Sequence, residues 1–227
     1  MPEGKRKPRA APHMNNILII SGGSFKKDRM ESYLKKNKYD HIIAADSGGE
    51  YAASLGLIPD LLLGDFDSVS NDTLDYFKSR RCRIKEFDPE KDMTDFDLAL
   101  NEAVSLSPER ITVIGGTGTR LDHTFTSIFC LFRGFKKGIY CEMIDPHNKI
   151  YFKDNDFKIK GEEQYGKYVS LVPVTESVIL SIKGMKYPLD ERKVFMGESL
   201  CQSNEIVCET AEIKVKGGVI AVFESMD

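Results

Sequence analysis

Short, continuous apolar runs constrain the fold of this chain more strongly than any other feature. They span residues 17–20, 42–45, 61–63 and 111–114, and each is followed by serine, glycine or aspartate. A segment with apolar residues at helical spacing, Met30, Tyr33 and Leu34, separates the first two runs. Strands that are apolar throughout are covered on both faces, so this alternation predicts an α/β fold built on a parallel sheet.

Two amphipathic helices are predicted in the same part of the chain. The first carries apolar residues at i, i+3, i+4, i+7 and i+8, namely Phe96, Ala99, Leu100, Ala103 and Val104. Thr94 precedes this stripe and Asp97 lies three residues on, which favours a capping-box start. The second opens near Leu121 or Asp122, ends around Gly134 and carries Phe125, Ile128, Phe129 and Phe132. We expect both stripes to face the core.

The pattern changes after about residue 148. Residues 168–174, 178–182 and 212–216 are strand-like, and Gly217-Gly218 forms a predicted tight turn into residues 219–223. We therefore expect a Rossmann-like α/β domain over residues 15–147 and a smaller antiparallel β-sandwich over residues 148–227. Residues 1–14 are interpreted as a disordered leader or a non-native remnant, with Met14 a candidate start.

Charge and cysteine content exclude several classes of protein. The net charge of −3 gives no reason to expect nucleic acid or a membrane surface as a partner. The longest apolar runs are too short to cross a bilayer. The five cysteines are scattered without a Cys-x-x-Cys pair, so neither a disulfide framework nor a zinc site is expected. Reduced thiols suit an intracellular compartment, and we expect a cytoplasmic protein.

Carboxylates gather at the predicted carboxyl ends of the strands, where open parallel sheets bind ligands. Asp46 follows the second apolar run, Asp65 and Asp67 follow the third, and Asp92 and Asp95 stand at the start of a predicted helix. Carboxylates held together repel one another unless a cation offsets their charge. Mg²⁺ is commonly held by a few carboxylates and substrate phosphates, so the pattern predicts a magnesium site.

A glycine-rich turn follows the fourth apolar run and leads into the second predicted helix. It spans residues 115–118, including Gly116 and Thr117, and Arg120 and Asp122 come directly after it. Such a turn at a helix start is a place where phosphates bind, through backbone N–H groups and the helix dipole. The guanidinium of Arg120 offers a planar fork that suits phosphate oxygens.

Each signal also has a structural interpretation. An Asp-x-Asp triplet is common in turns, and Asp95 and Asp97 could complement a helix N-terminus, which we favour for Asp97. His123 at a helix start is more often structural, the glycines could form only a flexible turn, and Arg120 could be a solvated charge. The combination, with Lys91 beside the acidic pair, predicts magnesium–nucleotide or magnesium–phosphate chemistry and leaves the acceptor open.

Six segments together resemble the ordered motifs of the thiamine pyrophosphokinase family. Each motif is loose alone, but six in this order are specific, and the match runs from about Ile17 to the end of the chain. The segments are residues 45–49 (ADSGG), 59–68 (PDLLLGDFDS), 91–95 (KDMTD), 118–123 (GTRLDH), 184–189 (GMKYPL) and 203–205 (SNE).

The resemblance implies an α/β ATP-binding domain, a β-sandwich that binds thiamine, and a homodimer whose active sites are shared between subunits. It implies Mg²⁺ as cofactor, with Asp65, Asp67 and Asp95 as ligands or close neighbours. The residues implied for ATP and its phosphates are Asp46, Lys91, Asp92, Gly116, Thr117, Arg120 and Asp122. Ser203 and Asn204 are implied to contact thiamine across the interface.

The implied reaction is attack of the thiamine hydroxyl on the β-phosphorus of ATP, with AMP leaving. We expect Asp67, Asp95 and Arg120 to be catalytic, with Asp67 or Asp95 orienting or deprotonating the hydroxyl. Two departures from the family pattern are Thr119 and Ser47, each at a position where the family often has glycine. The alternatives are a magnesium-dependent phosphohydrolase and a non-catalytic nucleotide- or thiamine-binding module; a glycosyltransferase is less favoured.

Overall fold

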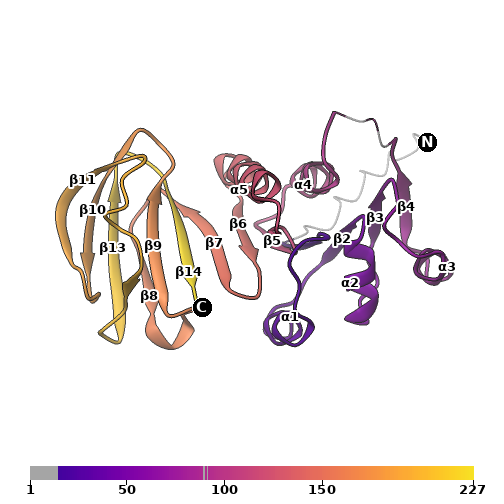
Figure 1. Cartoon of the computed structure of the whole chain (residues 1–227), viewed down its shortest axis with the longest axis horizontal. Helices are drawn as coiled ribbons and strands as arrows, with labels where there is room; N and C mark the ends of the chain where they lie inside the picture. Colours follow the sequence, from indigo (N-terminus) through magenta and orange to yellow (C-terminus); the bar gives the residue numbers. More distant parts are fainter. Residues whose placement is uncertain (1–14, 89, 91) are drawn as a thin grey trace, which may run out of the picture.

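The computed structural model of the chain describes residues 15–88, 90 and 92–227. Of the sequence predictions, the leader at residues 1–14 and the phosphate-binding role of Lys91 lie outside the described residues. The described chain forms two sheets. Figure 1 shows the helices gathered around one half of the molecule and a helix-poor, layered half beside it.

The larger sheet has ten strands in the order β12-β9-β14-β7-β6-β5-β1-β2-β3-β4. The six strands from β6 to β4 are parallel: β1 (Asn16–Ile20), β2 (His41–Ala45), β3 (Leu61–Gly64), β4 (Arg83–Glu86), β5 (Arg110–Ile114) and β6 (Tyr140–Ile144). The remaining four pair antiparallel: β7 (Asn148–Lys153), β9 (Tyr168–Pro173), β12 (Asn204–Glu205) and β14 (Ile220–Ser225).

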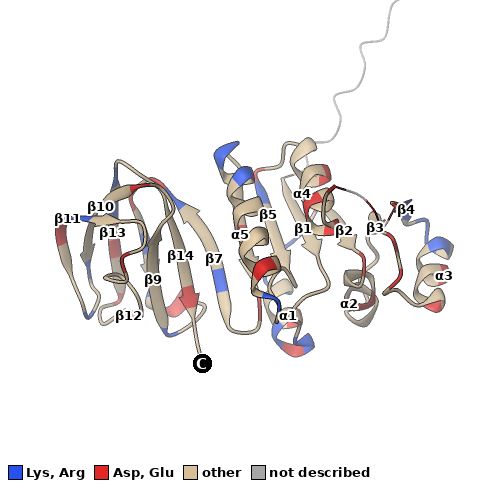
Figure 2. Cartoon of the chain, turned by 45° about the horizontal axis from the view of Figure 1, so that its top comes forward, with Lys and Arg blue, Asp and Glu red and all other residues tan. Residues whose placement is uncertain are grey.

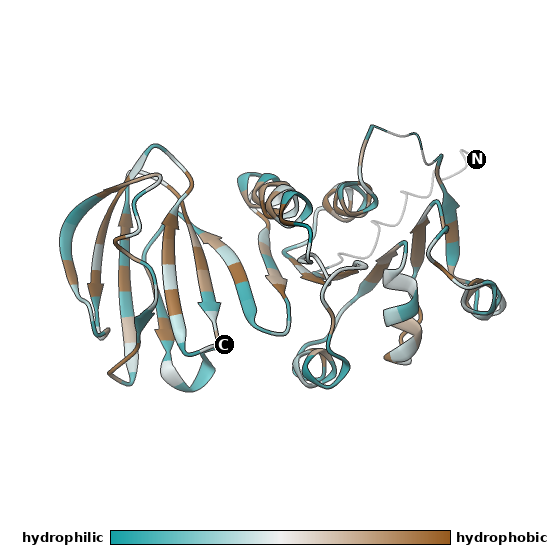
Figure 3. Cartoon of the chain, in the orientation of Figure 1, coloured by the Kyte–Doolittle hydropathy of each residue, from teal (hydrophilic) through white to brown (hydrophobic). Residues whose placement is uncertain are grey.

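Helices cover both faces of the parallel half. Three lie on one face: α1 (Lys27–Leu34), α2 (Gly48–Ser54) and α3 (Asn71–Ser79). Two lie on the other: α4 (Asp95–Ser105) and α5 (Leu121–Lys136). Because both faces are covered, the central strands are apolar throughout, and residues 17–20 of β1 are fully buried. Figure 3 shows this hydrophobic centre in brown.

The second sheet has four antiparallel strands in the order β11-β10-β13-β8. They are β8 (Phe157–Lys160), β10 (Ser177–Lys183), β11 (Leu189–Phe195) and β13 (Thr210–Lys216), and a short 3₁₀ helix, η1 (Gly161–Glu163), follows β8. Alternate residues of this sheet, such as Leu180 and Ile213, are buried against Val169 and Val222 of the large sheet. The two sheets therefore form a sandwich, and one of its layers continues the parallel sheet through the β6–β7 pair.

The structure confirms a mixed α/β fold with a parallel sheet and a separate antiparallel sheet, as the sequence predicts. The Thr94 hydroxyl accepts a hydrogen bond of 3.2 Å from the backbone N–H of Asp97, which is the predicted cap of α4. The prediction for α5 is partly wrong, because Phe125 and Phe129 are 66% and 43% exposed while Ile128 and Phe132 pack on the core.

Candidate active site

A cavity of about 720 Å³ opens at the carboxyl ends of the parallel strands. It is lined by the loops after β1, β2, β3 and β5 and by the starts of α4 and α5. Figure 2 shows acidic residues in red in the loop that follows β3 and on α4. The described residues that line the cavity all belong to the first 127 positions, so this chain's own sandwich contributes none of them.

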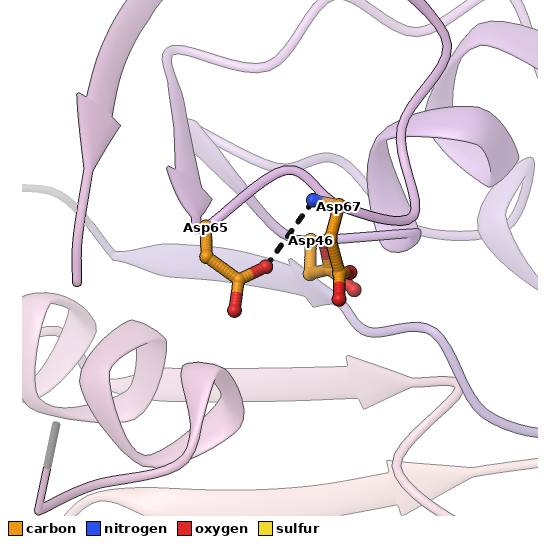
Figure 4. Close-up of side chains that lie close together, drawn as sticks. All are labelled: Asp46, Asp65 and Asp67. Atoms are coloured by element: carbon orange, nitrogen blue, oxygen red, sulfur yellow. Dashed lines mark hydrogen bonds between the residues drawn. The ribbon is translucent and has the colours of Figure 1, made fainter. Parts of the chain in front are cut away.

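Three carboxylates meet at the edge of this cavity: Asp46 and Asp65 line it, and the exposed Asp67 lies beside them. Asp46 follows β2, Asp65 and Asp67 follow β3, and one oxygen from each lies within 4.8 Å of the others. Figure 4 shows the three side chains together, with the backbone N–H of Asp67 donating a 3.3 Å hydrogen bond to Asp65. The β3 strand gives way to a tight turn, because Phe66 has a φ of 62°. This left-handed residue brings the two aspartates to one side.

The adjoining glycine lets the two strand ends approach each other. Gly64 has a φ of 150°, and a Cβ there would lie 3.1 Å from the backbone of Asp46. Asp46 itself has a φ of 47°, a left-handed conformation that aspartate tolerates better than most residues. Two residues with left-handed backbone, Asp46 and Phe66, thus lie at the carboxylates, and functional sites commonly hold such strained conformations.

The electrostatics of the three carboxylates favour a bound cation. Burial raises the pKa of Asp46, and the negative charges of Asp95, Asp65 and Asp67 raise it further, against a lowering contribution from the backbone N–H of Ser47. Oδ1 of Asp46 is buried and has no hydrogen-bond partner among the described residues. An ion with a preference for oxygen ligands would satisfy this atom and offset the repulsion, so the donor set fits Mg²⁺.

The group of three carboxylates in the structure differs from the set of metal ligands that the sequence predicts. Asp65 and Asp67 lie in the group of three, and its third member is Asp46, which was expected to bind nucleotide. Asp95 is the first residue of α4, lines the same cavity and is near enough to raise the pKa of Asp46. Asp92 also lines the cavity.

The glycine-rich loop after β5 forms another wall of the cavity. Gly116, Thr117 and Arg120 line the cavity, and the loop is bonded to the loop that follows β1. The backbone N–H of Gly23 donates to the carbonyl of Gly115 over 2.8 Å, and that of Ser24 donates to the carbonyl of Thr117 over 2.6 Å. These bonds hold the two loops against each other at the strand ends.

Two charged residues stand where the glycine-rich loop enters α5. Nη2 of Arg120 donates a 2.8 Å hydrogen bond to Asp122, and both side chains are exposed. This bond lowers the pKa of Asp122. Arg120 therefore has a carboxylate partner at the cavity mouth, and it can exchange that partner for a phosphate at small cost because both groups are solvated. His123 lines the cavity beside them.

The two residues expected to contact thiamine lie in the other half of the chain. Ser203 precedes β12, at the edge of the ten-stranded sheet, and has a φ of 54°. The Asn204 side chain is 5% exposed. It accepts from the backbone N–H of Tyr187 over 3.0 Å and donates to its carbonyl over 2.8 Å. Neither Ser203 nor Asn204 lines the cavity described above.

Sequence reasoning missed several residues that line the cavity. Ser21, Gly22 and Gly23 follow β1, and Thr126 and Ser127 lie on α5. The Ser-Gly-Gly segment could have been found by the strand-end argument that found the aspartates. Thr126 and Ser127 lie within a stripe that the apolar pattern marks only as helix, so periodicity gives no signal for them.

The fold and the cavity define a class of protein, namely α/β proteins that bind phosphorylated ligands where parallel strands end. Comparison with known proteins identifies the family. Residues 31–143 match the model "Thiamin pyrophosphokinase, catalytic domain" and residues 154–220 match "Thiamin pyrophosphokinase, vitamin B1 binding domain". The chain belongs to the thiamine pyrophosphokinase family, as the sequence motifs predict.

Individual relatives agree with this assignment. The chain is 32% identical to the thiamine pyrophosphokinase of Bacillus subtilis, with 94% of this chain and 100% of the relative covered. The crystal structure of the Bacillus subtilis enzyme superposes with a TM-score of 0.84 at 29% identity, covering 94% of this chain and 100% of that one. The Geobacillus thermodenitrificans enzyme gives 0.78 at 27% identity, with coverages of 93% and 98%.

None of the helices within the described residues is both long and apolar enough to cross a membrane.

Proposed function

We propose that this chain transfers the diphosphoryl group of ATP to the hydroxyl of thiamine, giving thiamine diphosphate and AMP. The observation that carries the proposal is the meeting of three carboxylates and a glycine-rich loop at one cavity, in a chain whose two halves both match the family. We assign ATP to residues 15–147 and thiamine recognition to residues 148–227.

Asp46, Asp65 and Asp67 would hold Mg²⁺, with Asp95 beside them. When bound, the ion supplies positive charge that offsets the phosphate oxygens of the nucleotide. The donor set supports this assignment, because it consists of carboxylates within 4.8 Å and includes a buried oxygen without a hydrogen-bond partner among the described residues.

The glycine-rich loop and the start of α5 would hold the nucleotide phosphates. Gly116 and Thr117 supply backbone near the helix N-terminus, where N–H groups and the helix dipole favour anions. Arg120 would turn from Asp122 to the phosphates and stabilise the charge that develops as AMP leaves. Asp92 lines the same cavity, and Lys91 is kept in this role on the sequence pattern alone.

Positioning and charge account for most of the expected rate, as in other phosphoryl transfers. The thiamine hydroxyl attacks the β-phosphorus, and its proton passes to a carboxylate. We keep Asp67 and Asp95 as the two candidates for that carboxylate, because Asp95 lines the cavity and Asp67 is grouped with Asp46 and Asp65, which line it. A carboxylate in this role also orients the hydroxyl for attack.

The thiamine site would be completed by a second copy of the chain, with Ser203 and Asn204 of the partner subunit facing the cavity. Two exposed apolar surfaces support a homodimer: one on α5, with Leu121, Phe125 and Phe129, and one near β12, with Tyr187, Leu200 and Val207. Tyr187 is 58% exposed and is held by Asn204, so we assign it the aromatic surface for thiamine.

The cytoplasm is the proposed compartment. The five cysteines are free, and four of them are buried, which is the usual state of cysteine in a reducing environment. No nucleic-acid or membrane partner is proposed, on the charge balance of the sequence.

Product analysis tests the proposed function. Incubation with ATP, Mg²⁺ and thiamine should give thiamine diphosphate and AMP in equal amounts, and no AMP without thiamine. Release of phosphate without an acceptor would instead identify a phosphohydrolase. Binding of nucleotide or thiamine without any product would identify a non-catalytic binding module.

A further inference from the structure

A buried carboxylate outside the cavity is bonded to the glycine-rich loop. Asp145 follows β6 directly and is 5% exposed. Its Oδ2 accepts a hydrogen bond of 2.7 Å from the hydroxyl of Thr117, and this bond is buried. The Thr117 hydroxyl therefore donates its proton to the residue that follows β6, although Thr117 itself lines the cavity.

The carboxylate of Asp145 is held by further neutral donors. Oδ1 accepts from the backbone N–H groups of His147 and Asn148 over 2.7 and 2.6 Å. The side-chain amide of Asn148 lies 3.1 Å from each oxygen, and the Tyr165 hydroxyl donates to the backbone carbonyl of Asp145 over 2.6 Å. A buried carboxylate with this many donors has one well-defined orientation, so it can fix a group that bonds to it.

The backbone of the glycine-rich loop is held by further hydrogen bonds. The carbonyls of Gly115 and Thr117 accept from the loop after β1, and the backbone N–H of Gly118 donates to the Thr124 hydroxyl over 2.9 Å. Asp145 adds a bond to the side chain of Thr117. Thr117 is thus held both through its carbonyl and through its hydroxyl.

We propose that Asp145 is a positioning residue for nucleotide binding: by accepting the Thr117 hydroxyl, it fixes the glycine-rich loop in the conformation that receives the phosphates. The inference rests on the proposed function, since that function assigns the phosphates to this loop. Asp145 touches no substrate and acts through Thr117. The Thr117 side chain then holds the loop in place through Asp145, and the backbone of the loop contacts the phosphates.

The two oxygens of Asp145 separate this role from a purely structural one. Oδ1 holds the turn between β6 and β7, whereas Oδ2 receives Thr117. Thr117→Val removes only the second bond and keeps the shape of the side chain. Thr117→Ser keeps the hydroxyl and should rescue binding. Asp145→Asn keeps an acceptor for the turn and replaces the other oxygen with a neutral donor. The Thr117 hydroxyl can then only accept from the amide, and its charge-assisted bond to the carboxylate is lost.

The test is calorimetric binding of α,β-methylene-ATP with Mg²⁺ to the full chain. We expect T117V and D145N each to weaken binding about fivefold to tenfold, from the loss of one buried hydrogen bond, and T117S to stay within about twofold of wild type. The double variant should bind about as weakly as either single variant, since both substitutions remove the same interaction. The KM for thiamine should not change.

A matched control is Asp156→Asn, since Asp156 accepts a backbone hydrogen bond of 3.0 Å from Val215 in the sandwich. D156N should leave nucleotide affinity unchanged, whatever it does to the melting temperature. Two results would overturn the inference. If T117V weakens binding and D145N does not, the hydroxyl contacts the nucleotide itself. If both lower only the melting temperature, Asp145 is merely structural.

The same experiment separates this inference from the proposed function. A wild-type chain that binds the analogue but makes no thiamine diphosphate contradicts the proposed function, while the pattern across the variants still decides the role of Asp145. A wild-type chain that makes thiamine diphosphate while D145N and T117V bind normally contradicts only the inference. A wild-type chain that does not bind the analogue contradicts both.

Discussion

The carboxylate of Glu50, near the start of α2, accepts a hydrogen bond of 2.7 Å from the backbone N–H of Ser70, just before α3. Its other oxygen accepts from the Thr73 hydroxyl over 2.8 Å. These bonds hold the far end of the loop that carries Asp65 and Asp67. Burial acts to raise the pKa of Glu50, but the hydrogen bonds from Ser70 and Thr73 outweigh it, and the pKa lies below its usual value of 4.5.

Glu50→Gln should loosen the acidic loop. We expect the free energy of unfolding to fall by about 1 kcal/mol, as for one lost hydrogen bond, and the Mg²⁺ concentration for half-maximal activity to rise. Because the folded-state pKa is below the unfolded value, the contribution of ionised Glu50 is complete above about pH 4.5 and is lost as the pH falls through the folded pKa. Denaturant melts of both proteins across this range measure it.

Glu31→Gln is the control for this comparison. Glu31 on α1 forms a surface ion pair with Lys35, which directly follows the helix. Loss of this pair should change stability by only about a few tenths of a kcal/mol and leave the Mg²⁺ dependence unchanged. Equal Mg²⁺ dependence in E50Q and wild type would show that Glu50 does not order the acidic loop.

Asp67→Asn and Asp95→Asn should each lower turnover by at least about a hundredfold, the low end of a general-base contribution. The loss should persist in kcat under saturating Mg²⁺ and ATP, because the missing group acts on the reacting hydroxyl; in D67N the Mg²⁺ concentration for half-maximal activity should rise as well, since Asp67 is also assigned to the ion. Asp75→Asn, at an exposed position on α3, should retain wild-type turnover. Near-normal turnover in both D67N and D95N would remove these carboxylates from the mechanism.

The sequence predicts the central strands well because their residues are buried on both faces. It misses β4, an edge strand whose pattern RIKE is mostly polar because the edge is partly solvated. It also misses β6, where Glu142 interrupts the apolar pattern. Glu142 is fully buried and accepts from Arg110, Thr112 and Tyr33, partners that a single strand's pattern does not show.

Sequence reasoning brings the acidic residues of the site to one edge of the sheet, but it does not give the contacts between loops that are distant in sequence. Strand ends placed the aspartates at one edge, but the choice between Asp46 and Asp95 as neighbour of Asp65 depends on which loops meet in space. The sequence pattern does not indicate a role for Asp145, since its hydrogen-bond partner Thr117 is 28 positions away. The apolar stripe of α5 shows another limit of sequence reasoning. Its pattern predicts that the side chains are buried, but it does not say whether this chain's own core or a second molecule would cover them.

Gly23→Ala should abolish nucleotide binding, whereas Gly22→Ala should be tolerated. A Cβ at Gly23 would lie 1.9 Å from the carbonyl oxygen of Thr117 and 2.5 Å from that of Gly115, so the two loops must separate. At Gly22 the obstacle is Oγ of Ser47, at 1.8 Å, which can rotate away. Calorimetry with Mg²⁺ and ATP analogue compares the two, and equal affinities would show that the contact between the loops is dispensable.

Phe125→Glu and Phe129→Glu should convert a dimer to a monomer in sedimentation experiments. Burying a charge in an apolar interface without a partner costs several kcal/mol, enough to dissociate most dimers. Ile58→Glu is the control, since Ile58 is 44% exposed and precedes the amino end of β3, whereas the cavity lies at the carboxyl ends of the strands. A chain that stays dimeric in both phenylalanine variants would assemble through another surface.

A site shared between subunits predicts that two inactive variants restore each other. Asp67→Asn disables the carboxylate group beside the cavity, and Ser203→Arg blocks the thiamine surface at an exposed position of the other half. A mixed dimer then has one site with both changes and one with neither. Random reassociation of equal amounts should give about a quarter of wild-type activity, because half of the dimers are mixed and each has one intact site. Sites formed within one chain would give no activity in the mixture, since every cavity and its own sandwich would then carry a disabling change.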